Sequence, residues 1–219
     1  MKKYVFLFSL MFYLYGLFSQ VQTKKIQDDE SVIILQSIQK KLKTLKTAEI
    51  KFNFRSEKEN KTLKTLQGHI WIKGEKYKLI IPTQHVYCDS INIWNYLPEQ
   101  NEVTISLYDP QDDENAFNPI KLISNYQKYY RSAFIREISE KGIIVQIIDL
   151  YPLQAAPFFK IRVVIDKKQL EIIRISISER DGFTYTYTFD TFIKNPKIND
   201  TFFIFNTLQY PNVEIIDMR

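Results

Sequence analysis

The sequence contains almost none of the residues that build metal centres or disulfide frameworks. Its 219 residues include one cysteine, Cys88, and two histidines, His69 and His85. A structural zinc site takes four Cys or His ligands and a disulfide takes two cysteines, so neither is expected, and we expect no cofactor. Only 5 glycines are present, which excludes collagen-like and glycine-rich low-complexity chains. Any chemistry would fall to carboxylates, hydroxyls or lysines.

The chain also has little excess charge. Lys and Arg number 30 against 25 Asp and Glu, giving a net charge of +5. Removal of an N-terminal leader with Lys2 and Lys3 lowers the basic count to 28 and the net charge to +3. Nucleic-acid binding needs a much stronger positive excess, so no nucleic-acid partner is expected.

The first nineteen residues differ from the rest of the chain. A basic start at Lys2 and Lys3 is followed by an apolar run over 4–18 and by Ser19. This order is typical of a secretory signal peptide, and about fifteen apolar residues fall short of the ~20 that span a bilayer, which is the alternative reading. We predict a signal peptide over 1–19, and one soluble periplasmic domain over 20–219. With no cysteine near the cleavage region, no lipid modification is expected there.

Past residue 28 the apolar residues recur with a helical period. Val32, Leu35, Ile38 and Leu42 share one stripe, so the spacing predicts an amphipathic helix over about 30–46. Beyond Thr47 the period falls to two, which predicts strands. We expect a polar turn over 56–62 and strands near 48–55, 63–73, 76–81, 85–89, 91–97, 102–108, 132–138, 143–151, 158–166, 170–179, 183–193, 201–206 and 213–218.

One segment interrupts the strands. An acidic stretch over 109–115 precedes Asn118-Pro119, where a second helix is expected to begin and run to about Tyr130. The acidic residues lack the glycine and glutamate spacing of a calcium loop, so a solvated loop is favoured over a metal site.

These elements predict a mainly β fold with two or three helices. Short spacings favour antiparallel hairpins, and a sheet of more than ~10 strands curls. We expect a single strongly curved antiparallel sheet, an open and incomplete β-barrel, with the helices covering its concave face. Such an arrangement either encloses an apolar cavity or has a filled core, and the periodicity does not separate the two.

Three motifs then follow in order: the helix and first strand, Gln67-Gly68-His69-Ile70-Trp71-Ile72-Lys73, and Cys88-Asp89-Ser90-Ile91-Asn92-Ile93-Trp94-Asn95-Tyr96-Leu97-Pro98. With the second helix, Asn118-Pro119-Ile120-Lys121-Leu122-Ile123, and a late Phe203-Ile204-Phe205 strand, the order resembles the periplasmic outer-membrane lipoprotein carrier family (LolA-like). Two departures stand out. Gly74 occupies the latch position, where members of the family carry an arginine that holds the helical lid closed, and Ser90 replaces a turn glycine. The C-terminal sequence also differs, which suggests a distant branch.

The resemblance implies a carrier that binds the acyl chains of lipoproteins and moves them from the inner to the outer membrane. It implies as partners lipoproteins and an inner-membrane lipoprotein-releasing ABC transporter, and leaves open whether an outer-membrane receptor exists. It also implies a monomeric carrier and no covalent chemistry. The residues that it predicts to line the cavity are Leu35, Ile38, Leu42, Ile50, Phe52, Phe54, Ile70, Ile72, Tyr77, Leu79, Ile81, Ile120 and Ile123.

Three other readings stay open. A periplasmic module of the same fold that senses lipids or lipoproteins in signalling is the main alternative. An enzyme built on His85, Cys88 and Asp89 is disfavoured, because strand residues three apart face opposite sides of a sheet. Lys40, Lys41, Lys43 and Lys46 form either a solvated helix face or a docking patch for an acidic partner.

Overall fold

The structure is a computed structural model, and it describes residues 28–110 and 119–219. The predicted signal peptide and most of the acidic segment lie outside these residues. No helix among the described residues is long and apolar enough to span a membrane.

The described residues form one curved, open sheet, as the sequence predicted, in the strand order β12-β6-β5-β4-β3-β2-β1-β11-β10-β9-β8-β7. The sheet does not close into a barrel, because β12 and β7 are its two edges. The strands are β1 (Ala48–Lys58), β2 (Lys61–Lys73), β3 (Lys76–Ile81), β4 (Gln84–Cys88), β5 (Asn92–Leu97), β6 (Glu102–Leu107), β7 (Tyr130–Glu140), β8 (Ile143–Pro152), β9 (Phe158–Asp166), β10 (Glu171–Glu179), β11 (Phe183–Lys194) and β12 (Glu214–Asp217).

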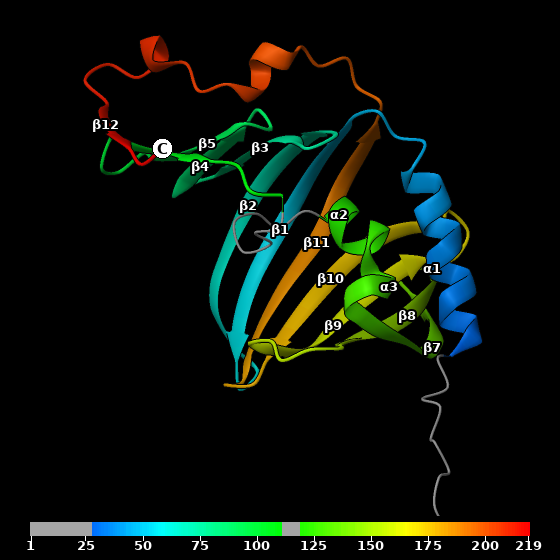
Figure 1. The fold of residues 1–219 in the computed structure, drawn as a ribbon. Helices are drawn as coiled ribbons and strands as arrows, with labels where there is room; N and C mark the ends of the chain where they lie inside the picture. The colour runs from blue at the N-terminus through cyan, green and yellow to red at the C-terminus, as the bar shows by residue number, and fades with distance from the viewer. Residues whose placement is uncertain (1–27, 111–118) are drawn as a thin grey trace, which may run out of the picture.

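The α-helices lie on the concave side of the sheet, in front of β7 to β10 (Figure 1). They are α1 (Asp29–Leu42), α2 (Pro119–Ser124) and α3 (Tyr126–Tyr129). Two short 3₁₀ helices, η1 (Asp200–Phe203) and η2 (Thr207–Gln209), belong to the C-terminal segment, which runs along the top of Figure 1 from the end of β11 to β12 beside β6.

Helix α1 begins with a side-chain cap and is tied to the sheet edge at the same point. Asp28 accepts a hydrogen bond from the backbone N–H of Glu30, and its second carboxylate oxygen accepts one from the N–H of Phe134 on β7. The Ser31 hydroxyl lies 2.8 Å from that of Ser132, and both are buried. The helix ends at Leu42, four residues before the predicted end.

Four local predictions were wrong. The strand predicted over 201–206 is instead η1 followed by irregular chain, because Asn199 caps the 3₁₀ turn and the packing of Phe203 and Phe205 sets its path. The turn predicted over 56–62 is only two residues long, with Glu59 and Asn60 at positive φ, so β1 and β2 are longer than expected. β12 pairs with β6 in parallel, whereas an antiparallel sheet was expected. The second helix, expected to run without a break to about Tyr130, is interrupted at Asn125.

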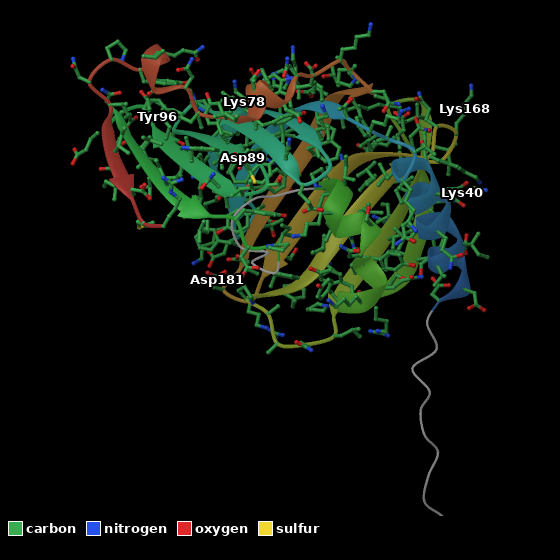
Figure 2. The ribbon with its side chains drawn as sticks, turned by 45° about the horizontal axis from the view of Figure 1, so that its top comes forward. Lys40, Lys78, Asp89, Tyr96, Lys168 and Asp181 are labelled. Atoms are coloured by element: carbon green, nitrogen blue, oxygen red, sulfur yellow. The ribbon has the colours of Figure 1, made fainter. Side chains whose placement is uncertain are left out.

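The C-terminal segment is held against the outer face by aromatic packing. Phe205 stacks on Tyr210 at 4.6 Å between ring centroids and contacts Tyr87 at 5.4 Å and Tyr96 at 5.5 Å. The ammonium of Lys78 lies 4.2 Å from the centre of the Phe202 ring, a cation–π contact. Figure 2 labels Lys78 and Tyr96 on the side of the sheet that this segment follows.

The outer face of β8 and β9 carries a buried ion pair. The side chain of Asp149 is 3% exposed and accepts two hydrogen bonds from Arg162, at 2.7 and 2.8 Å. The bidentate pairing raises the pKa of Arg162 and compensates the burial of the carboxylate. The pair thereby fixes the register of the two strands beside a small buried apolar cluster on the same face, formed by Val145, Ile147 and Val164.

A glycine in β2 makes room for an aromatic ring on the concave face. Gly68 lies directly opposite Phe52 in the β1–β2 ladder. A Cβ atom at Gly68 would lie 2.1 Å from Cζ of Phe52, so the ring covers the glycine and no other residue fits without displacing it.

Gly68→Ala is expected to lower the free energy of unfolding by about 1–3 kcal/mol, because the buried Phe52 ring must move. In a Phe52→Leu background, whose shorter side chain does not reach across β2, the same change is expected to cost less than about 0.5 kcal/mol. Urea denaturation of the four proteins gives the coupling. An equal cost of Gly68→Ala in both backgrounds would contradict this packing.

Candidate functional site

The concave face carries two apolar clusters. The first lies where the helices cover β8, β9 and β10, and it includes Leu35 and Ile38 of α1 with Ile123 of α2. All three side chains are at most 1% exposed. Strand residues of the same cluster come from the inward positions of the sheet, such as Ile148 and Ile175. This half of the face is therefore sealed by the helices.

The second cluster lies on the concave face of β1 to β5. It is formed by Ile50, Phe52, Ile70, Ile72, Tyr77, Val86, Cys88 and Ile93. Phe54, Leu79 and Ile81 pack against it and are only partly buried. Figure 1 shows α1, α2 and α3 in front of the opposite half of the sheet, so this half relies on fewer helical contacts.

Three residues join the two clusters. Ile120 of α2 and Phe189 and Phe192 of β11 pack against both, and all three are partly buried. The α2 helix is fixed beside this junction, because the side-chain amide of Gln39 donates to the carbonyl oxygens of Ile123 at 2.9 Å and Ser124 at 3.1 Å. The helix thus reaches from a sealed core to the less covered half of the face.

A row of aromatic rings continues from the second cluster along β1 and β11. Tyr187 lies 5.8 Å from Phe52 and 5.1 Å from Phe54, and Phe54 stacks on Tyr185 at 6.1 Å. Burial raises the pKa of the Tyr187 hydroxyl to about 12, so this ring is uncharged at neutral pH. The row presents a broad, uncharged aromatic surface that continues the second cluster along β1 and β11.

The predicted lining residues all lie on the concave side of the molecule, in two groups that share Ile120. Those in or against the first cluster are Leu35, Ile38, Leu42, Ile120 and Ile123. Those in or against the second are Ile50, Phe52, Phe54, Ile70, Ile72, Tyr77, Leu79, Ile81 and Ile120. Sequence reasoning missed Phe189 and Phe192, although the alternation of Phe183, Tyr185, Tyr187 and Phe189 contained the signal for the first of them.

Gly74, the predicted latch position, lies in the two-residue turn between β2 and β3. Its φ is +58°, and a Cβ atom there would meet no atom within 4 Å. An arginine at this position has room but would adopt a left-handed backbone, at a cost of about 1–2 kcal/mol. The flanking Lys73 and Lys76 both pair with Asp200, at 2.6 and 2.8 Å, so the turn is attached to the C-terminal segment.

Ser90 tolerates its position in the β4–β5 turn because Asp89 supports the backbone. The φ of Ser90 is +76°, and the Asp89 carboxylate accepts hydrogen bonds from the N–H groups of Ile91 and Asn92, at 2.9 and 2.7 Å. The replacement of the family's glycine therefore leaves this turn intact.

The structure offers no support for a nucleophile at Cys88. Its side chain is fully buried within the second cluster, and burial raises the pKa of the thiol to about 11. His85 lies on the opposite face of β4, where burial lowers its pKa. No group of three or more His, Cys, Asp or Glu side chains that could hold a metal ion occurs in the described residues.

A separate groove of about 490 Å³ lies on the outer face over β1 to β4. Lys51, Gln67, His69 and Ile80 line it, and they alternate along their strands with inward residues of the second cluster. The Nδ1 atom of His85 is buried at this groove without a hydrogen-bond partner in the described structure. The groove is mixed in polarity and open to solvent, unlike the concave face.

Cys88 is expected to react slowly with a thiol reagent such as a disulfide chromophore at pH 8. A pKa of about 11 in place of 9 lowers the thiolate fraction about a hundredfold, and burial blocks access as well. The rate should rise at least a hundredfold in denaturant. Equal rates in native and denatured protein would contradict the buried position.

Ile123→Ala is expected to lower the free energy of unfolding by about 2–5 kcal/mol, since the side chain is fully buried in the first cluster. Ile120→Ala, at the partly buried junction, is expected to cost less than half as much. Chemical denaturation of both variants measures the difference. A larger loss for Ile120→Ala would show that the junction, and not Ile123, anchors α2.

Comparison with known proteins agrees with this architecture. The model of the family described as outer membrane lipoprotein carrier protein LolA matches residues 43–206. A search of curated proteins found no match. Among solved structures, an uncharacterized conserved protein from Thermus thermophilus has a TM-score of 0.57 at 8% identity, over 85% of this chain and 99% of that one.

Two further structures are similar at lower scores. A LolA superfamily protein from Nitrosomonas europaea has a TM-score of 0.43 at 10% identity, covering 80% of this chain and 97% of that one. The complex of MucA and MucB from Pseudomonas aeruginosa gives 0.43 at 12% identity, covering 81% and 62%. With three quarters of its length matched by the family model, the chain belongs to the outer membrane lipoprotein carrier protein LolA family.

Proposed function

We propose that this protein binds the acyl chains of lipoproteins between the concave face and the helices, and carries them across the periplasm from the inner to the outer membrane. The observation that best supports this proposal is the junction of two apolar clusters at Ile120, Phe189 and Phe192. There, partly buried side chains connect a sealed core to a less covered apolar face. An acyl chain that entered there would replace water at apolar atoms on both sides.

The energetics favour a carrier of this kind. An acyl chain of about sixteen carbons in water costs on the order of 10 kcal/mol, at about 0.8 kcal/mol per CH₂. A soluble protein therefore has to cover the chain throughout its passage. Transfer from a bilayer to an apolar protein face gains little, because both environments are dry and apolar. Loading then requires work from a transporter, whereas unloading requires only a comparable acceptor.

Family membership supports a lipid- or lipoprotein-binding role in the periplasm. Members of this family are binding or carrier proteins, and no catalytic arrangement is needed for the transfer. We assign loading to an inner-membrane lipoprotein-releasing ABC transporter and unloading to an outer-membrane acceptor. The carrier acts as a monomer, since one sheet and its helices supply the complete apolar face.

Leu79 and Ile80 offer a matched test, because they are adjacent, partly buried and on opposite faces of β3. Leu79→Glu places a carboxylate against the acyl chains and is expected to reduce release of lipoproteins from spheroplasts of the source bacterium at least about tenfold. Ile80→Glu is expected to leave release within about twofold, because it alters the outer face. Circular dichroism and thermal midpoints establish that both variants are folded.

Normal release by folded Leu79→Glu protein would contradict the carrier proposal. The signalling alternative has its own outcome: purified wild-type protein would bind an apolar fluorescent acyl probe, with Leu79→Glu weakening that binding, yet wild-type protein would release no lipoprotein.

A further inference from the structure

The lysines of this chain gather at one end of the molecule. The lysine-rich end is formed by the C-terminal part of α1, the β7–β8 and β9–β10 turns and the chain after β11. Its members are Lys40, Lys41, Lys43, Lys46, Lys141, Lys167, Lys168, Lys194 and Lys197. Figure 2 labels Lys40 and Lys168 on the same side of the molecule, away from Tyr96 and Asp181.

Hydrogen bonds and ion pairs make this end continuous. The Lys41 ammonium donates to the carbonyl of Gln169 and pairs with Glu171 at 3.2 Å, which joins α1 to the β9–β10 turn. Glu171 also pairs with Lys194 of β11. The Lys46 backbone N–H donates to the side chain of Asn195 at 2.8 Å, which brings in the chain after β11.

Most of these lysines are not neutralised. The ion pairs at this end involve Lys41 and Lys194 with Glu171, and Lys167 with Glu137. Within residues 28–110 and 119–219, no carboxylate lies within ion-pair distance of the remaining exposed lysines. Those lysines are Lys40, Lys43, Lys46, Lys141, Lys168 and Lys197. The surface therefore carries a strong local positive charge on a chain of small net charge.

Two exposed isoleucines lie among these charges. Ile143 and Ile144, at the start of β8, are 39% and 45% exposed. The backbone N–H of Lys167 donates to the carbonyl of Ile144 at 3.0 Å, so the isoleucines adjoin both turns that carry lysines. Apolar side chains next to flexible lysine side chains are typical of protein surfaces that lie at a lipid interface.

We propose that the lysine-rich end docks the protein reversibly and end-on against an anionic lipid surface, so that Ile143 and Ile144, on opposite faces of β8, both enter the interface. The predominance of lysine over arginine at this end favours an anionic lipid surface over an acidic protein as the partner. Arginine forms planar bidentate pairs with defined carboxylates, whereas lysine is a hydrated point charge suited to a diffuse anionic layer. Arg136 and Arg174 lie level with each other, farther along β7 and β10 than the turns of this end, and Arg174 is already paired with Glu140 at 2.9 Å.

Docking of this kind does not depend on the acyl-chain proposal. It would keep a carrier at a membrane between loading and unloading, at a strength that salt and lipid composition tune. The failure of either proposal is visible separately, because acyl-probe binding reports on the concave face and vesicle binding reports on the lysine-rich end.

The test is cosedimentation of the full mature protein with vesicles of phosphatidylglycerol and phosphatidylethanolamine, against vesicles of phosphatidylcholine. Wild-type protein is expected to bind only the anionic vesicles, and less as salt rises. A Lys43→Gln, Lys46→Gln, Lys168→Gln triple variant is expected to bind about a hundredfold more weakly, at about fivefold for each lysine. Ile144→Ser is expected to weaken binding about five- to tenfold.

The matched control removes three exposed lysines elsewhere, with Lys61→Gln, Lys64→Gln and Lys128→Gln. It has the same net charge as the triple variant and is expected to bind within about twofold of wild type. Equal losses in the two variants, or no binding of folded wild-type protein to anionic vesicles, would overturn the proposal. In the second case an acidic protein would be the better partner for this end.

Discussion

The structure depends on one constraint, which is that a twelve-stranded sheet with an apolar concave face must keep that face out of water. Residue alternation supplies the apolar side, and curvature brings its two halves toward each other. The three α-helices of the described residues lie over the half formed by β7 to β10. The other half is packed mainly by its own strand side chains, and the proposed carrier function rests on this asymmetry between the two halves.

Contacts of the helices and contacts on the outer face stabilise different parts of the structure. Ile123 and the Gln39 amide fix α2 in the sealed half, so Ile120 is held at the junction. On the outer face, the Asp149–Arg162 pair links β8 to β9, and the packing of Phe205 with Tyr210 helps to hold the C-terminal segment against the sheet. The concave side can therefore remain apolar throughout, because register and attachment are supplied by polar and aromatic contacts elsewhere.

Much of the fold follows from periodicity, and the errors have local physical causes. The alternation in β1 and β11 and the helical stripe of α1 identified those elements, because one face of each is buried. The segment around Phe203 read as a strand because its apolar residues are closely spaced, yet Asn199 caps a 3₁₀ turn there. Parallel pairing of β12 with β6 depends on a long return of the chain, which local sequence does not encode.

The candidate site was only partly accessible to sequence reasoning for a similar reason. Inward positions such as Ile70 and Leu79 follow from alternation, but it does not say which cluster each joins. Phe192 follows a register shift between β1 and β11, which moves its place relative to the alternating residues before it. Gly68 was recognised as part of a motif, whereas its contact with Phe52 appears only when the strands are paired.

The most direct measurement of the central claim is photo-crosslinking in the living cell. A diazirine amino acid placed at Ile120, at the junction, is compared with one at Ile33, which lies on α1 and is 64% exposed. The account predicts crosslinks from position 120 to the acyl chains of lipoproteins, and little or none from position 33. Equal crosslinking from both positions, or none from position 120 in folded protein, would contradict it.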